Sequence, residues 1–503
     1  MPARMIRFWT LMAALGSGII PAHPEPVTVD RISYRNLRLY VQGPVPWLTA
    51  QDMNGDGLAD LVVQNGRSIE VYLQDARTGI TPTPKAVLPL PERTFVYDVG
   101  VRAKGAETGV VAVHPDGVEW YGYRNDAFVA PEPWLEFPTL FRGTCTGNPV
   151  RAGLLFDMEG DGDSDLVLPD RDGFLIFVAG ESGFALSQRL AAETSVLLAP
   201  YGRSIQDPMQ ASLTLPSFHF GDVNGDARLD LLLEGFYSFD IYYQDTQGRY
   251  DAKPSVTVSV NAAGVKKKSG RRYFMYEVPP KVTDLNADGY VDAVATFPSK
   301  GVTGIYLGKA AGSQVFETPD QVIRFDGWTL AHVLQDVNGD QRKDLILAKM
   351  EKVGFWGGLQ ILITRTIDVD ILAYLEAPDG RYPESPSFQK TIEVPLILSA
   401  SHQMLKIETP HLLNFAGDFN RDGRKDMLFK SAPDRLTVNF GTSEGVFTED
   451  DPLEIATVDT SAFSSSQPTV ADINGDGLSD LVLYHRDFTS EKHLIEVLLS
   501  KTD

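Results

Sequence analysis

The chain has 503 residues, of which 43% are hydrophobic and 22% are charged, so it has the composition of a folded globular protein and wholesale disorder is excluded. Its 67 acidic and 45 basic side chains give a net charge of −22, which argues against a general role in binding nucleic acid or anionic lipid. The single cysteine, Cys145, excludes an internal disulfide framework and a cysteine-based zinc site.

Residues 1–22 have the pattern of a secretory signal peptide. Two arginines precede an apolar run over Phe8–Leu15, and Ala22 precedes a proline-rich stretch. A membrane anchor is the alternative, but the apolar run is short for a span and is followed by glycine and proline. We expect cleavage near Ala22, which leaves residues 23–503 as an exported protein, secreted or periplasmic, with no membrane span.

A nine-residue acidic pattern followed by an apolar run occurs seven times. The first copy is Asp52–Asp60, followed by Leu61-Val62-Val63. The long gap after it contains Phe95–Gly100 and Gly109–Val113, which indicates a further unit whose acidic loop has been lost. Eight units then follow one another at a mean spacing of about 60 residues, a period typical of repeat architectures. The seven acidic copies begin at Asp52, Asp157, Asp222, Asp284, Asp336, Asp418 and Asp472.

Each unit has the pattern of four short strands. An extended stretch leads into the acidic loop, the apolar run after it predicts a buried strand, and two further strand-like runs follow. Four-stranded units repeated around an axis are typical of β-propeller blades, so we expect an all-β chain. The last unit lacks a fourth strand, and the isolated stretch Ile32–Val41 can supply it. The prediction is one closed propeller over residues 23–503 with eight blades, or seven if the degenerate unit merges with a neighbour.

The acidic loops have the donor set of a calcium site. In the pattern D-x-[DN]-x-D-G-x-x-D, side chains at positions 1, 3, 5 and 9 and the carbonyl at position 7 can converge on one cation, and Ca²⁺ prefers oxygen ligands in that number. We therefore expect up to seven structural calcium ions. The candidate ligands are Asp52, Asn54, Asp56, Leu58 and Asp60; Asp157, Glu159, Asp161, Asp163 and Asp165; Asp222, Asn224, Asp226, Arg228 and Asp230; Asp284, Asn286, Asp288, Tyr290 and Asp292; Asp336, Asn338, Asp340, Arg342 and Asp344; Asp418, Asn420, Asp422, Arg424 and Asp426; and Asp472, Asn474, Asp476, Leu478 and Asp480.

These loops differ from EF-hands, because an apolar residue stands where an EF-hand has its twelfth-position glutamate. Glycine at position 6 allows the sharp turn, but Ala227 and Gln341 replace it in the third and fifth loops, where we expect weaker binding. The alternative is that all seven loops are solvated turns without metal. Seven bound Ca²⁺ ions would bring the net charge to about −8, which would account for most of the acidity.

The repeated D-x-N-x-D-G-x-x-D pattern with its apolar run resembles the FG-GAP and VCBS-type repeats of integrin α-subunit propellers and of many exported bacterial proteins. The resemblance covers essentially the whole chain after residue 22. It implies a propeller in which each metal braces the turn between the first two strands of a blade. The Phe-Gly element is kept at Phe220-Gly221, whereas the Gly-Ala-Pro element has no counterpart closer than Ser431-Ala432-Pro433.

The expected function is non-enzymatic binding, adhesion or scaffolding, with a glycan or another exported or cell-surface protein as partner. A basic insertion, Lys266–Phe274, and an aromatic segment, Phe355–Gly358, are candidate recognition surfaces. No catalytic residues are identified. The alternative is a polysaccharide-active, lyase-like enzyme, which needs a cation beside a uronate and a base in a pocket.

Overall fold

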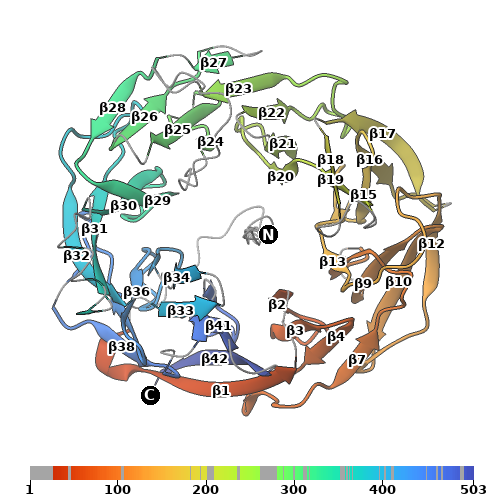
Figure 1. Cartoon of the computed structure of the whole chain (residues 1–503), viewed down its shortest axis with the longest axis horizontal. Helices are drawn as coiled ribbons and strands as arrows, with labels where there is room; N and C mark the ends of the chain where they lie inside the picture. The colour runs from red at the N-terminus through yellow and green to blue at the C-terminus, as the bar shows by residue number, and fades with distance from the viewer. Residues whose placement is uncertain are drawn as a thin grey trace.

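The structure is a computed structural model of the whole chain (Figure 1). It describes residues 27–42, 47–103, 107–181, 183–192, 194–200, 209–234, 238–260, 280–286, 288–297, 301–309, 314–316, 318–351, 357, 361, 363–364, 366–395, 397–401, 404–408, 413–448, 450–459, 463–465, 468–487 and 492–502. The predicted signal peptide and the basic insertion Lys266–Phe274 lie outside the described residues, as does most of Phe355–Gly358. Among the described residues, no helix is long and apolar enough to cross a bilayer.

Eight antiparallel sheets stand in a ring around a central axis, which confirms the all-β propeller with eight blades (Figure 1). In most blades the strands run outward in chain order from the innermost, or first, to the outermost, or fourth. Blade 1 holds β2 (Trp47–Gln51), β3 (Asp60–Asn65), β4 (Ser68–Tyr72) and β7 (Ala86–Pro89). Blade 2 holds β8 (Val96–Val101), β9 (Thr108–His114) and β10 (Gly117–Arg124), with β11 (Ala127–Phe128) and β12 (Glu132–Glu136) on β10 and β13 (Val150–Arg151) on β8.

The next three blades follow the same order. Blade 3 holds β14 (Leu155–Phe156), β15 (Asp165–Asp170), β16 (Gly173–Val178) and β17 (Ala185–Ala191). Blade 4 holds β20 (Ser217–Gly221), β21 (Asp230–Glu234), β22 (Ser238–Tyr242) and β23 (Val256–Val260), with β27 (Gln314–Phe316) on β23. Blade 5 holds β24 (Lys281–Thr283), β25 (Asp292–Phe297), β26 (Val302–Tyr306) and β28 (Gln321–Arg324).

The last three blades complete the ring. Blade 6 holds β29 (Trp328–Gln335), β30 (Asp344–Met350), β31 (Thr366–Tyr374) and β32 (Phe388–Pro395). Blade 7 holds β35 (Leu413–Asn414), β36 (Met427–Ala432), β37 (Arg435–Asn439) and β38 (Leu453–Ala456). Blade 8 holds β39 (Phe463–Ser465) and β40 (Thr469–Ala471), both on β41 (Asp480–Asp487), then β42 (Lys492–Thr502) and finally β1 (Ile32–Gln42), which follows the short 3₁₀ turn η1 (Val29–Arg31).

The ring is closed by the predicted N-terminal strand. β1 lies along β42 in an antiparallel register that runs without a break from Ile32 opposite Thr502 to Gln42 opposite Lys492. In Figure 1 the red β1 forms the outer edge beside the blue β42. Backbone groups that would be open at the edge of the last blade are therefore paired.

The hydrophobic core lies between neighbouring blades. At the seam between blades 8 and 1, Leu39 and Val41 of β1 pack with Leu61 and Val63 of β3 and with Val497 of β42 in one cluster. The apolar face of each blade is covered by the next blade. The strands that carry each acidic loop are therefore held in place by packing against neighbouring sheets.

Blade 2 is the unit that lacks an acidic loop, as predicted. Asp98 of β8 is buried, and its carboxylate accepts the N–H of Leu154 at 2.8 Å and pairs with the Nε of Arg151 at 2.9 Å. Arg151 lies on β13, which pairs with β8 in parallel, and its guanidinium lies over the ring of Trp47. The blade that lacks the acidic loop therefore has an internal salt bridge at its first strand.

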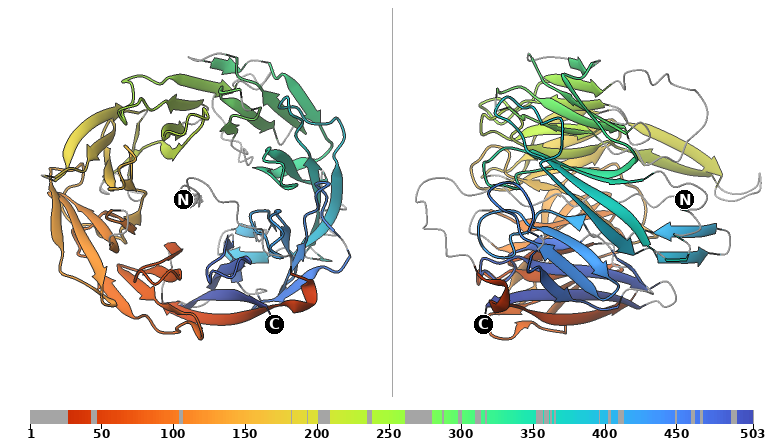
Figure 2. Two further views of the ribbon diagram at one scale, coloured as in Figure 1. Left: turned by 180° about the vertical axis from the view of Figure 1, so that it is seen from behind. Right: turned by 90° about the vertical axis from the view of Figure 1, so that its left-hand side faces the viewer.

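Three two-stranded hairpins stand apart from the blades: β5–β6 (Gln74–Asp75 and Gly79–Ile80), β18–β19 (Ser195–Pro200 and Met209–Thr214) and β33–β34 (Ile397–Ser401 and Met404–Glu408). The last two join the fourth strand of one blade to the first strand of the next. In an antiparallel blade, that link lies at the opposite end from the turn between strands one and two. Figure 2, in its right-hand view, shows both hairpins projecting from one side of the ring.

The closing strand contributes to stability through its inward side chains. Leu39 is 2% exposed, so Leu39→Ala is expected to lower the free energy of unfolding by about 2–5 kcal/mol. The neighbouring Tyr40 is 69% exposed, and Tyr40→Ala is expected to change it by no more than about 0.5 kcal/mol. Urea unfolding of both variants measures the difference. Equal effects would mean that β1 does not pack as described.

Candidate metal centres

The seven acidic loops occupy the same place in seven blades, between the first and second strands. In the first loop, the carboxylate of Asp52 accepts the N–H of Gly55 at 2.7 Å and that of Gly57 at 2.9 Å. The side-chain oxygen of Asn54 accepts the N–H of Asp56 at 3.0 Å. In all seven loops, the first-position carboxylate accepts the N–H of position 6, and the fifth-position carboxylate accepts that of position 7. The loops therefore share one turn geometry.

The ninth-position aspartate is the most buried member of each loop. Asp60 accepts the N–H of Met53 at 2.9 Å and the N–H of Gln74, at the end of the third strand, at 2.8 Å. Equivalent pairs of bonds are made in the other six blades. One carboxylate thus joins the base of its loop to the end of the third strand. The seven side chains, each 0–1% exposed, are Asp60, Asp165, Asp230, Asp292, Asp344, Asp426 and Asp480.

In two blades, the residue that donates from the end of the third strand is a glutamine that also contacts the preceding blade. The side-chain amide of Gln74 donates to the carbonyl of Ile473 at 2.9 Å, and that of Gln244 donates to the carbonyl of Met158 at 2.6 Å. Both acceptors are second-position residues of the neighbouring loop. The sequence analysis did not identify these glutamines. Their common separation of 14 residues from the ninth-position aspartate was the available signal.

Burial changes the ionisation of the ninth-position carboxylates. It raises the pKa of Asp60 to about 6, with the charges of Asp56 and Asp52 adding to this and the two backbone N–H bonds opposing it. Burial and neighbouring loop carboxylates likewise raise the pKa of the ninth aspartate to about 6 in four other loops, and burial raises that of Asp480 to about 6 against hydrogen bonds from Ser500, Ile473 and Asn474. The exception is Asp426, whose pKa is raised to about 8. Six of the seven loops therefore hold carboxylates that repel the ninth aspartate, a repulsion that a bound cation would remove.

The turn at position 6 is left-handed whether or not glycine stands there. Its φ is 87° at Gly57, 65° at Ala227 and 68° at Gln341. A side chain in this region is strained relative to glycine, as expected for the third and fifth loops. Whether their metal affinity is lower stays a prediction.

The predicted ligands are brought together in part. In the first loop, Asn54 and Asp56 bond to each other and Asp52 accepts N–H groups of the same turn, whereas position 9 is directed to the backbone of position 2 and of the third strand. Within the described ranges, no group of three or more His, Cys, Asp or Glu side chains is arranged to hold a metal ion. In the second loop, Glu159 stands at position 3 and the backbone N–H of Asp163, at position 7, donates to Asp161.

The donor set fits calcium in its chemistry. Carboxylate and amide oxygens prevail at positions 1, 3, 5 and 9, and these are the hard ligands that Ca²⁺ prefers. A carboxylate oxygen that accepts one N–H keeps a further acceptor site for a cation. The repulsion that Asp52 and Asp56 exert on Asp60 is the electrostatic condition that a divalent ion removes.

Comparison with known protein families identifies part of the repeat region. Residues 418–483, which span the sixth and seventh loops, match the family described as FG-GAP-like repeat. No curated protein matches the chain in sequence.

Solved structures resemble the chain weakly. They include a lectin of Agrocybe aegerita described as recognising non-reducing terminal N-acetylglucosamine (14% identity, 85% of this chain and 91% of that chain, TM-score 0.42). They also include the V. cholerae biofilm matrix protein Bap1 (12%, 91% and 87%, 0.33) and a putative 6-phosphogluconolactonase from Bacteroides uniformis (12%, 84% and 97%, 0.33). At these scores the similarities carry no argument about function.

The raised pKa values predict an unusual pH dependence for the calcium-free protein. A carboxyl whose pKa is about 6 when folded and 3.8 when unfolded binds its proton more tightly in the folded state. Its stabilising effect is complete below pH 3.8 and is lost as the pH rises through 6, so melting temperature should fall between pH 5 and pH 7 in chelator. Calcium should flatten or reverse that slope, because it binds the ionised form.

Thermal melts in buffers across that range, with chelator and with calcium, measure both slopes. Asp75→Asn is the control, since backbone N–H bonds lower the pKa of this exposed carboxyl and it does not titrate in the range. A melting temperature that rises from pH 5 to pH 7 in chelator would contradict the prediction.

Proposed function

Because the chain is an eight-bladed β-propeller with FG-GAP-like repeats, we propose that it is an exported, calcium-stabilised binding module for a glycan or another exported protein. The predicted signal peptide supports export, to the periplasm or the cell exterior. The calcium ions brace the blades and take no part in chemistry.

The observation that carries this proposal is the repetition of one bonding pattern in seven loops. A catalytic metal needs an open coordination position for substrate or water. Here the same turn recurs in seven of eight blades, and each copy ties the first, second and third strands of its own blade together. Seven equivalent braces suit a framework whose function lies elsewhere on its surface.

The face opposite the loops carries the features that suit a partner. Hairpins β18–β19 and β33–β34 project there (Figure 2). Val196 and Leu213 lie opposite each other across β18–β19 and are 65% and 37% exposed. A two-stranded ribbon is marginally stable alone, and exposed apolar side chains on it favour contact with a ligand. We place the binding surface on this hairpin face.

Removal of calcium should destabilise the fold. Each site that binds only the folded state adds RT ln(1 + [Ca²⁺]/Kd), which is about 2.7 kcal/mol at a hundredfold excess over Kd. We expect chelation to lower the melting temperature by several degrees or more, measured by calorimetry at pH 7.5. Mg²⁺ should restore less of the melting temperature than Ca²⁺ does, because Mg²⁺ requires a smaller, octahedral site. Identical melts in chelator and in calcium would refute the structural role.

Binding can be tested on a panel of immobilised acidic and neutral polysaccharides, with retention and release of unsaturated sugar ends recorded together. We expect retention without cleavage, weakened about tenfold by the double variant Val196→Ser, Leu213→Ser. Val87→Ser, at a residue 49% exposed on the outer strand β7, is the matched control and should bind normally.

The other outcomes separate the alternatives. Cleavage would overturn the non-enzymatic role. Retention that is indifferent to the hairpin variant would move the binding surface to the loop face. Absence of retention on every polymer would leave an exported protein as the partner class.

A further inference from the structure

Three of the seven loops carry arginine at position 7. The motif uses only the backbone carbonyl of this residue, so the side chain is free to vary, and the other loops have leucine, aspartate or tyrosine there. The three residues, in blades 4, 6 and 7, are Arg228, Arg342 and Arg424.

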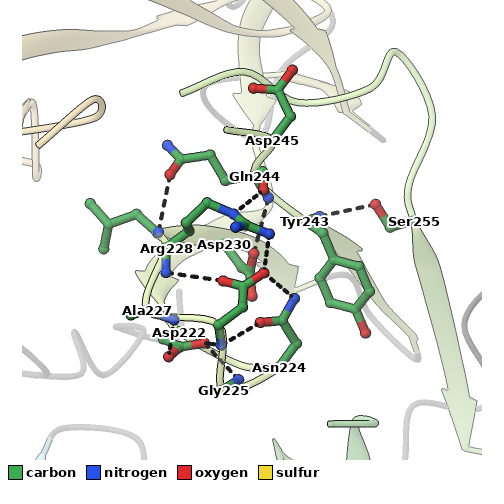
Figure 3. A network of polar contacts seen from close by, with 12 residues as sticks. Asp222, Asn224, Gly225, Ala227, Arg228, Asp230, Tyr243, Gln244, Asp245 and Ser255 are labelled. Atoms are coloured by element: carbon green, nitrogen blue, oxygen red, sulfur yellow. Dashed lines mark hydrogen bonds and ion pairs between the residues drawn. The ribbon is translucent and has the colours of Figure 1, made fainter. Parts of the chain in front are cut away.

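Each of these arginines folds back over its own loop. In the third loop, Nη2 of Arg228 forms an ion pair with the fifth-position Asp226, and Nε donates to the carbonyl of Gln244 at 2.8 Å. Figure 3 shows the side chain of Arg228 reaching from the loop to Gln244. Gln244 is the residue whose backbone N–H donates to the ninth-position Asp230.

The same two contacts are made in the other two loops. Nη2 of Arg342 pairs with Asp340, and Nε donates to the carbonyl of Glu376 at 3.1 Å. Nη2 of Arg424 pairs with Asp422 at 2.6 Å, and Nε donates to the carbonyl of Gly441 at 3.2 Å. We call these three the arginine-clamped loops.

The clamp places a permanent positive charge beside the calcium donors. A guanidinium stays protonated at any pH at which the protein is folded. The guanidinium neutralises the fifth-position carboxylate, which would otherwise attract the ion, and occupies one oxygen of that carboxylate. It also repels a second cation a few ångströms away. It also ties the loop to the end of the third strand, so a clamped loop is closed before any metal binds.

Among the described residues, no arginine forms an ion pair with a ligand carboxylate of the four unclamped loops, and the second loop has Asp163 at position 7. In the first and fourth loops, the fifth-position carboxylate receives a side-chain bond from the amide of Asn54 or Asn286, at 3.0 Å in each case. In the seventh loop, the carboxylate of Asp476 receives bonds from Asn474 and from the hydroxyl of Ser500, and the guanidinium of Arg421 donates to the backbone carbonyl of Asp476 at 3.0 Å. The side-chain donors to these fifth-position carboxylates are neutral, and Arg421 reaches a carbonyl rather than a carboxylate, so none of the three carboxylates is neutralised by an ion pair.

We propose that the chain has two classes of calcium loop: four that bind tightly, beginning at Asp52, Asp157, Asp284 and Asp472, and three arginine-clamped loops that bind at least about tenfold more weakly. The proposal rests on the calcium role given above. The proposal goes beyond that role, because it assigns control of the calcium affinity to the side chain at position 7. The weak sites are the ones that respond when calcium varies in the surroundings.

The position of the weak loops connects them to the hairpin face. The first strand of blade 4, β20, runs from hairpin β18–β19 to the clamped loop at Asp222. The first strand of blade 7, β35, likewise lies between hairpin β33–β34 and the clamped loop at Asp418. Both projecting hairpins therefore lead into a blade whose metal site is filled last.

Calorimetric titration of the chelated, full-length protein with calcium tests the proposal. We expect about four tight sites followed by about three weaker ones. The decisive variant is Arg424→Leu, because its loop keeps glycine at position 6 and any change comes from the arginine alone. It should move one site from the weak to the tight class.

Two further variants complete the design. Arg435→Leu removes an exposed arginine from the same blade that pairs with Glu454 and lies outside the loop, so it should leave both classes unchanged. Leu58→Arg adds the clamp to the first loop and should move one site from tight to weak. Circular dichroism checks the fold, and melts in chelator add a second readout, since loss of the clamp should lower the calcium-free melting temperature of Arg424→Leu.

The outcomes are distinguishable. Seven sites of one affinity, unchanged in Arg424→Leu, would overturn the two-class proposal and leave the calcium role intact. A titration without any binding would overturn both. A site count of four and three that shifts to five and two in Arg424→Leu would support the proposal.

Discussion

The buried ninth-position aspartate is the interaction on which the propeller depends. Its carboxylate is removed from water and accepts one N–H from the acidic loop and one from the end of the third strand. A buried charge is costly unless it is bonded, so the chain cannot bury Asp60 without bringing both segments to it. Repeated in seven blades, this requirement sets where the first strand ends, where the second begins and how far the third extends.

Much of the fold could be predicted from the sequence, because each unit shows its strands in its own residues and the last unit lacks a fourth strand. The apolar run after each loop predicted the second strand, and the isolated stretch Ile32–Val41 predicted ring closure. What was missed depends on contacts between distant segments. Gln74 reaches the loop of the preceding blade around the closed ring, and Asp98 meets Arg151 through a parallel strand. The 14-residue separation from Asp60 could have pointed to Gln74, but no sequence pattern identifies its partner in the other blade or joins Asp98 to Arg151.

The arginine clamps show a second limit of motif analysis. The seventh position enters the pattern through its carbonyl, so its side chain was not considered, yet in three loops that side chain lies on a candidate ligand. Because the motif uses only the backbone of this position, its side chain can form other interactions. In this chain the task is electrostatic, and it distinguishes loops that the motif treats as equal.

The pairing of β1 with β42 has a consequence for how the molecule is made. These strands form a continuous ladder although they lie at opposite ends of the chain. Contacts so distant in sequence form late, since the whole intervening chain must be ordered first. During synthesis, β1 is made first but cannot pair until β42 has been made, and blade 8 has an open edge until then. A chaperone that covers that edge until β1 and β42 pair would protect the chain from incorrect strand pairing.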